Sequence, residues 1–200
     1  MEEKFGQIRL DGRFGRWIAL LAGSDHVTSL LEIGTWKGMG STALIARALE
    51  GRTGVHAVSI ESNVEFHKIA QQNLKSFQQP ELIWGSIVSH GELDEENLTG
   101  QEPVWLQDDL TALEAAPVLK SEIPDTLDFL LLDGGEFSSW AEFMILLPRL
   151  KKFVLLDDTF VRKNRKTDAF LRASPEWLLI DSGRDRNGWS VWLRTSWNEN

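Results

Sequence analysis

Hydrophobic and polar residues along this chain form alternating blocks that predict strands and helices in turn. Short apolar runs are typical of buried strands, whereas apolar residues that recur every three or four positions indicate amphipathic helices. The predicted strands, the third of them interrupted at Gly85 and Ser86, cover residues 30–33, 55–60, 81–88, 128–133 and 151–158. The predicted helices cover residues 11–22, 41–49, 66–74 and 140–147. This alternation predicts an α/β fold, a Rossmann-like open sheet with helices on both faces.

The end of the chain breaks the alternation. Residues 176–181 and 188–195 are both strand-like, and Asn187 followed by Gly188 is a turn signal between them. We therefore expect five parallel strands and then a C-terminal antiparallel hairpin over residues 177–195. The whole chain, residues 1–200, is expected to form one domain.

The stretch Ser29–Leu49 predicts a strand, a glycine-rich turn and a helix. Gly34, Gly38 and Gly40 permit positive φ and let a ligand approach the backbone, while the free N–H groups of the next helix point toward the turn. We expect a polar or anionic ligand there, and the alternative is an ordinary loop in which the glycines serve only local geometry. Glu32 lies in the apolar strand before the turn, where a carboxylate is costly unless it accepts hydrogen bonds.

Acidic residues stand at the ends of most predicted strands. In an open α/β sheet, ligands bind outside the carboxyl ends of the strands, so these acids are candidates for one site. Glu61 follows Gly34 by 27 residues, about where a ribose-binding acid stands after a glycine turn. The candidate positions in chain order are Glu32 with Gly34, Glu61, Gly85 with Ser86, Asp133 with Gly134, and Asp157 with Asp158.

These motifs resemble those of a known family. EIGTWKGMGS, residues 32–41, resembles the first motif of class I S-adenosylmethionine-dependent methyltransferases, and LLLDGGEF and FVLLDDT resemble the motifs of their fourth and fifth strands. The resemblance covers most of the chain, and the terminal hairpin is similar to the family's antiparallel seventh strand. DG followed by DD is similar to metal-dependent O-methyltransferases of the catechol and macrolide-sugar types, and FkbM-type methyltransferases are further candidates. The expected strand order is 3-2-1-4-5-7-6.

The resemblance implies S-adenosylmethionine as the cofactor. The residues expected to bind it are Glu32, Gly34, Thr35, Gly38, Gly40, Ser41, Glu61, Ser86 and Asp133. Three positions depart from the family pattern: Ser41 stands one position late, Glu136 replaces the usual histidine of DG-x-His, and Ser86 replaces a third-strand acid.

A divalent cation, Mg²⁺, is the second expected group. Asp133 and Asp157 end neighbouring strands and Asp158 follows, so three carboxylates converge where hard oxygen ligands suit Mg²⁺. The alternative is that Asp158 caps the next segment and Asp133 serves the cofactor.

The catalytic candidates are Asp133, Asp157 and His90. His90 follows the third strand at the ligand edge and is a candidate general base, with Lys163 and Asn164 of the basic run RKNRK as alternatives. The loop-like, acidic segment 89–124, with a short helix predicted over residues 110–119, is expected to supply the acceptor pocket.

The composition of the chain limits the classes of molecule that it is expected to bind. A net charge of −9 argues against a nucleic-acid footprint, and without cysteine or tyrosine the chain has no thiolate or phenolic chemistry. No apolar run could span a membrane and the N-terminus lacks a signal-peptide pattern, so we expect a cytoplasmic protein. The sequence predicts methylation of an oxygen on a small-molecule acceptor, such as a sugar or natural product, and leaves a homodimer open.

Two other functions remain to be weighed. A methyltransferase-like binding or scaffold domain would keep the fold without turnover, and the departure at Glu136 leaves that alternative open. A nicotinamide-binding Rossmann protein would use the same Glu61, but its Gly-x-Gly-x-x-Gly fingerprint differs from the order of Gly34, Gly38 and Gly40.

Overall fold

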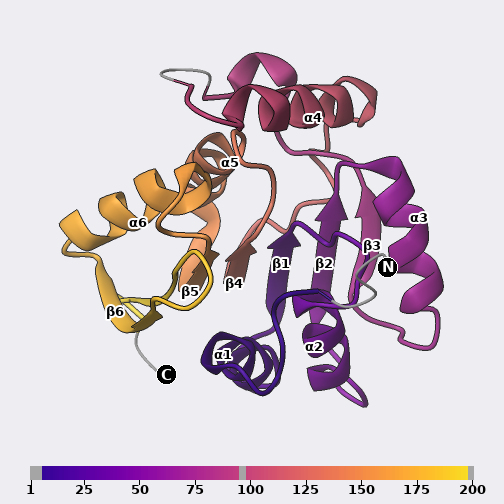
Figure 1. The fold of residues 1–200 in the computed structure, drawn as a ribbon. Coiled ribbons are helices and arrows are strands. Elements are labelled where there is room, and N and C mark those ends of the chain that lie inside the picture. The colour runs from indigo at the N-terminus through magenta and orange to yellow at the C-terminus, as the bar shows by residue number, and fades with distance from the viewer. Residues whose placement is uncertain (1–5, 95–97, 198–200) are drawn as a thin grey trace.

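The structure is a computed structural model that describes residues 6–94 and 98–197. Its strands are β1 (Ser29–Ile33), β2 (His56–Glu61), β3 (Glu81–Trp84), β4 (Leu127–Leu132), β5 (Leu150–Asp157), β6 (Trp177–Gly183) and β7 (Trp189–Arg194). They form one seven-stranded sheet in the order β3-β2-β1-β4-β5-β7-β6 (Figure 1). The first five run parallel, and β7 pairs antiparallel with both β5 and β6. The predicted strand order and the antiparallel hairpin are confirmed.

Helices cover both faces of this sheet and its carboxyl end. They are α1 (Arg13–Ala22), α2 (Ser41–Ala48), α3 (Val64–Asn73), α4 (Glu102–Ala115), α5 (Ser139–Leu146) and α6 (Arg162–Ala173), with the 3₁₀ helices η1 (His90–Glu92) and η2 (Leu147–Arg149). In Figure 1, α4 lies beyond the tips of the β1 and β2 arrows, so it faces the strand ends rather than the flat of the sheet.

Two apolar layers hold the sheet, because alternate residues of a strand point to opposite faces. In β1, Leu30 packs in a cluster with Phe14 of α1 and Ile45 of α2, whereas Leu31 belongs to the cluster that contains Phe143 of α5. Both leucines are fully buried. The apolar residues of the central strands therefore form the core on both faces of the sheet.

The third strand is shorter than predicted. β3 ends at Trp84, and the next residues pair with a different segment: Ser86 N–H donates to Pro117 O at 3.0 Å, and Leu119 N–H donates to Ser86 O at 2.7 Å. Glycine at position 85 makes this close approach possible, since a Cβ there would lie 2.7 Å from Leu119 Cγ. The interruption predicted at Gly85 and Ser86 thus ends the strand, because the chain leaves β2 for residues 117–119.

Two helices differ from the sequence prediction. The short helix predicted over residues 110–119 is α4, which begins at Glu102 and ends before Pro117. Its start is fixed by Thr99, whose backbone N–H donates to Glu102 Oε2 at 2.6 Å, and its apolar residues do not recur regularly enough to reveal its length. The basic run RKNRK indicated only a helix start, whereas α6 continues for 12 residues and buries Leu171.

Among residues 6–94 and 98–197, no helix is both long and apolar enough to cross a membrane.

Candidate active site

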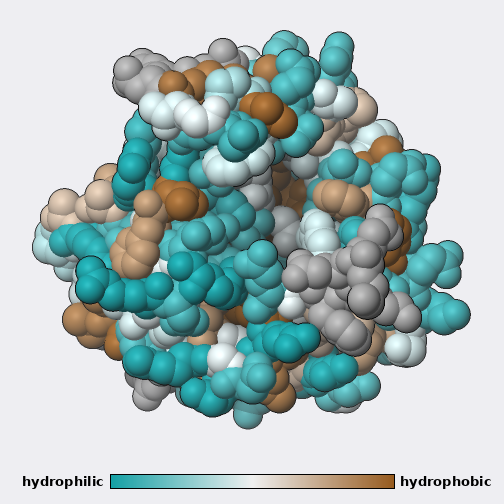
Figure 2. All heavy atoms as spheres, viewed as in Figure 1, coloured by the Kyte–Doolittle hydropathy of each residue, from teal (hydrophilic) through white to brown (hydrophobic). Residues whose placement is uncertain are grey.

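A cavity of about 440 Å³ lies at the carboxyl ends of the parallel strands, beneath α4. The turn after β1, the ends of β2, β4 and β5, residues of α4 and α5, and the turn between β6 and β7 all contribute to its lining. Figure 2 shows this face hollowed near its centre, below α4, with hydrophilic side chains beside the hollow. The strand order reverses between β1 and β4, and open α/β sheets bind ligands at such a point.

Glu61, the last residue of β2, presents a fixed carboxylate to the cavity. Its Oε2 accepts a hydrogen bond from the backbone N–H of Trp36 at 2.6 Å, and its Oε1 accepts one from Asn63 N–H at 2.8 Å. Burial raises the pKa of Glu61 to about 7, although the two backbone donors oppose the rise. A carboxylate has about four acceptor positions, so both oxygens can still accept from the hydroxyls of a ligand.

Glu32 is fully buried and lies outside the cavity lining. The register of β1 and β2 pairs it with Ser59, whose Oγ donates to Glu32 Oε2 at 2.5 Å. Ser59 Oγ also shares a hydrogen bond of 2.6 Å with Thr35 Oγ1. Burial raises the pKa of Glu32 to about 7, against the effect of the Ser41 and Ser59 hydroxyls. Glu32 therefore positions the glycine turn through Ser59 and Thr35.

Gly34 lets the turn after β1 approach the end of β4. Its φ is +102°, and a Cβ at this position would lie 2.1 Å from the carbonyl oxygen of Asp133. Gly38 has a φ of +77° but packs against Ala70 of α3, away from the cavity. The two glycines thus serve different purposes: Gly34 brings two strand ends together, and Gly38 seats the turn on a helix.

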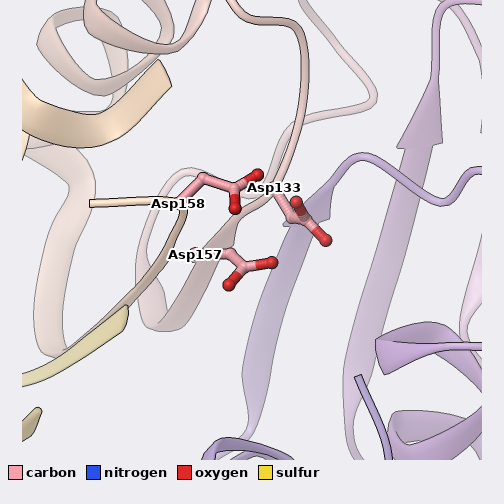
Figure 3. Close-up of side chains that lie close together, drawn as sticks. All are labelled: Asp133, Asp157 and Asp158. Atoms are coloured by element: carbon pink, nitrogen blue, oxygen red, sulfur yellow. The ribbon is translucent and has the colours of Figure 1, made fainter. Parts of the chain in front are cut away.

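Three carboxylates converge beside the turn. Asp133 follows β4, Asp157 ends β5 and Asp158 follows it, and one oxygen from each lies within 4.8 Å of the others (Figure 3). Strands β4 and β5 are neighbours in the sheet, with Leu132 opposite Leu156, so their ends lie side by side. The convergence of these three acids, predicted from their strand-end positions, is present in the structure.

Two basic side chains lie on these carboxylates. Lys163 Nζ is 3.0 Å from Asp133 Oδ1 and 2.8 Å from Asp158 Oδ2, and the guanidinium of Arg186 pairs with Asp157 Oδ2. Burial lowers the pKa of Lys163, but the carboxylates outweigh burial and raise it above its ordinary value. Lys163 is therefore an ammonium and cannot serve as the general base, one of the roles that the sequence had left open for it.

Asp157 differs from the other two acids in one oxygen. Its Oδ1 is buried without a hydrogen-bond partner among the described residues, and Asp157 lines the cavity. Burial and the neighbouring Asp133 raise the pKa of Asp157, while Arg186 opposes the rise.

The start of α6 is tied to the ends of β4 and β5. Asn164 is fully buried, and its Nδ2 donates to Leu132 O at 3.0 Å and to Asp157 O at 2.8 Å. Glu136, which replaces the histidine of the family motif, accepts from the backbone N–H of Lys163 at 3.2 Å. Asn164 and Glu136 thus hold the backbone that carries Lys163, and the amide of Asn164 is engaged in structure rather than in proton transfer.

Further acids come from α4 and α5. Asp109 and Glu142 both line the cavity, and Asp109 Oδ2 accepts from Phe137 N–H at 3.0 Å. Glu142 is 3% exposed, and its Oε2 has no hydrogen-bond partner among the described residues. Burial raises the pKa of Glu142 to about 8, so it is mostly protonated at neutral pH and can donate a hydrogen bond.

The structure brings most of the predicted site residues to one cavity. Those in its lining are Gly34, Thr35, Gly40, Ser41, Glu61, Ser86, Asp133, Asp157 and Asp158. Glu32 and Gly38 support the turn from outside the lining. His90 lies in η1, is exposed, and is also outside the lining, so the structure does not bring this predicted general base to the cavity.

Sequence reasoning missed several residues of the lining. Trp36 and Phe66 form an edge-to-face pair with ring centroids 6.3 Å apart, and Arg186 enters from the β6–β7 turn. No strand-end rule points to an arginine in a hairpin turn, whereas the position of Trp36 inside the glycine turn was a usable signal. Asp109 lies on α4, whose predicted range began one residue later, at 110. Glu142 lies on α5, which was expected only to pack against the core.

Comparison with known proteins gives a likeness in structure but not in sequence. No family model matches the chain, and no curated protein matches its sequence. An O-methyltransferase from Bacillus cereus, in complex with S-adenosylhomocysteine, is 18% identical, with 90% of this chain and 80% of that chain covered and a TM-score of 0.61. The O-methyltransferase TomG from Streptomyces achromogenes, involved in tomaymycin synthesis and in complex with S-adenosylmethionine, is 17% identical, with 91% and 79% covered and a TM-score of 0.60.

A third similar solved structure is an rRNA methylase from Streptococcus thermophilus. It is 10% identical, with 94% of this chain and 98% of that chain covered and a TM-score of 0.53. The chain therefore has the Rossmann-like fold of class I S-adenosylmethionine-dependent methyltransferases, as its motifs predicted. Methylases of small molecules and of RNA share this fold, so the acceptor has to be inferred from the site.

Proposed function

We propose that this protein is an S-adenosylmethionine-dependent methyltransferase that acts on an oxygen of a small molecule. The observation that carries the proposal is the Glu61 carboxylate, held toward the cavity by the N–H groups of Trp36 and Asn63. Gly34 and Thr35 line the same cavity. An acceptor for two ribose hydroxyls and a glycine turn for a charged amino-acid end are the parts that this cofactor needs.

The residues of the cavity fit the cofactor in chemistry. Glu61 can accept from the ribose, and Gly34 and Thr35 line the part of the cavity proposed for the methionine end. The Trp36 and Phe66 rings, with Leu113 of α4, offer apolar surface for a base. The bound cofactor supplies a methyl group on a sulfonium, an electrophile that already carries its leaving group.

The chain's own residues then have two tasks, alignment and proton removal. Alignment would fall to the residues that would hold the cofactor, Glu61 and the turn at Gly34, which would present its methyl group to the acceptor oxygen. The proton of the acceptor hydroxyl goes to a carboxylate of the lining, for which Asp157, which pairs with Arg186, is the candidate. Asp133 holds Lys163 beside it.

A small molecule is the better candidate for the acceptor than a nucleic acid. The net charge of −9 and the acids Asp108 and Asp109 in the lining would repel phosphates. Segment 89–124, of which residues 95–97 lie outside the described residues, supplies Asp108, Asp109, Ala112 and Leu113 of α4 to the lining, which supports its proposed role at the acceptor.

The Mg²⁺ expected from the sequence at Asp133, Asp157 and Asp158 is not part of this proposal. The three carboxylates suit a cation, but Lys163 and Arg186 already lie on them. A divalent ion would have to displace the ammonium of Lys163, so the residues as they stand do not fit it. A cytoplasmic location and a homodimer stay predictions.

The test is isothermal titration of the protein with S-adenosylhomocysteine and, separately, with NAD. We expect one site per chain for S-adenosylhomocysteine and no binding of NAD. Binding of NAD alone would instead support a nicotinamide protein. Cofactor binding without methyl transfer to any member of a panel of sugars and phenols would favour the binding or scaffold domain.

A further inference from the structure

The carboxylate cluster formed by Asp133, Asp157 and Asp158 carries its own counterions. Two of its members contact Lys163 and the third contacts Arg186. The ammonium side chain is 14% exposed, and the carboxylates beside it are 21% and 15% exposed for Asp133 and Asp158. Contacts this sheltered from solvent are screened weakly, so the charges hold one another more firmly than a surface ion pair would.

The position of Lys163 is fixed from the backbone side as well. The neighbouring Asn164 donates to Leu132 O and to Asp157 O, the last carbonyls of β4 and β5. The backbone N–H of Lys163 donates to Glu136 Oε1. These bonds hold the first turn of α6 against the same two strand ends that carry the acids. The backbone of Lys163 therefore lies beside the carboxylate cluster.

The ammonium is not saturated by these contacts. An ammonium has three N–H donors, and two are directed to Asp133 and Asp158. Lys163 also lines the cavity. The third N–H is therefore available to an oxygen of a ligand in the cavity.

We propose that Lys163 is the resident cation of this cluster: it takes the place of a divalent metal ion and donates a hydrogen bond to the acceptor oxygen. The cluster then holds no Mg²⁺ or Mn²⁺ while Lys163 is present. In this role Lys163 only orients the acceptor oxygen and keeps its own protons. The proton of the acceptor goes to a carboxylate. The part that concerns the acceptor rests on the proposed function, whereas the exclusion of metal ions does not.

The experiment is a titration of the purified full chain with Mn²⁺ alone, followed by the loss of the free-ion signal in electron paramagnetic resonance. It compares the parent with Lys163→Met, which removes the charge and keeps a side chain of similar length. Lys166→Met is the matched control, because Lys166 lies on the same helix but is 53% exposed and contacts Asp94 instead. We expect no site in the parent or in Lys166→Met below millimolar Mn²⁺, and one site, at least tenfold tighter, in Lys163→Met.

Two results would overturn the proposal. One is a one-to-one Mn²⁺ site in the parent that is lost in Asp158→Asn, and the other is a folded Lys163→Met protein that binds Mn²⁺ no better than the parent. Circular dichroism and thermal unfolding establish whether the variant is folded. If it is not, the parent titration alone decides, since metal binding there contradicts a resident ammonium. Neither measurement uses cofactor or acceptor, so failure here is distinct from failure to bind S-adenosylhomocysteine.

Discussion

Replacing Glu61 by glutamine should weaken cofactor binding by about ten- to a hundredfold. In the parent, Glu61 Oε1 and Oε2 each accept one backbone N–H and keep a lone pair for a ribose hydroxyl. Glu61→Gln keeps the shape and one acceptor oxygen, but its NH₂ group faces a backbone donor and cannot accept from the ribose. Loss of a hydrogen bond to a charged group costs about 1.5–3 kcal/mol, and every 1.4 kcal/mol is tenfold in Kd.

The assay is isothermal titration with S-adenosylhomocysteine at pH 8, where the Glu61 carboxyl, with a pKa of about 7, is mostly ionised. Glu65→Gln is the matched control, because Glu65 lies on α3, is exposed and pairs with Lys68. We expect its Kd to equal that of the parent. A Glu61→Gln protein that is folded and binds within twofold of the parent would show that Glu61 does not meet the ribose, and the assignment of the cavity would have to change.

Three further outcomes follow from buried groups. The free energy of unfolding should fall as pH rises from 5 to 8, because Glu32 keeps its proton in the folded state up to about pH 7 but loses it near 4.5 when unfolded. Urea unfolding at both pH values should show Glu32→Gln removing about 3 kcal/mol of that fall; an unchanged slope contradicts this. Gly34→Ala should cost more than about 3 kcal/mol, against about 1 kcal/mol for Gly51→Ala, since both have positive φ but only Gly34 would clash with backbone; equal costs contradict this. Asn164→Ala should cost about 2–4 kcal/mol in the same assay by removing the side-chain donor to two strand-end carbonyls, and a neutral effect would refute its role.

Much of the fold could be predicted because the central strands are buried on both faces. DFLLLD and KKFVLLDD leave few alternatives to a parallel strand, and the hairpin follows from two strand-like runs around Asn187 and Gly188. Only part of helix α4 was predicted, over residues 110–119, because its apolar residues lack a regular spacing. Only the start of helix α6 was predicted, because charged residues dominate its sequence and only a few positions, such as Leu171, face the core.

The residues of the site also include some that could be predicted from the sequence and some that could not. Strand-end acids were predictable, because a residue directly after a buried strand lies at the sheet edge whatever the loops do. The counterions were not: Lys163 reaches Asp133 and Asp158 from a helix, and Arg186 reaches Asp157 from a turn. Such contacts depend on side-chain reach across elements that are distant in sequence, which no spacing rule encodes. Glu32 was placed in the binding site for a related reason, since a buried strand acid can serve the ligand or, as here, the turn beneath it.

The position of β7 between β5 and β6 affects the order in which the chain can assemble on the ribosome. The acids that end β4 and β5 are synthesised before Lys163, and Arg186 follows later still. β5 has no partner on its outer edge until β7 has emerged, even though β6 is made first. A nascent chain that ends before residue 186 therefore holds three converging carboxylates without their guanidinium and a central strand with an open edge. Arg186, which completes the site, and β7, which completes the sheet, are therefore both added at the end of synthesis.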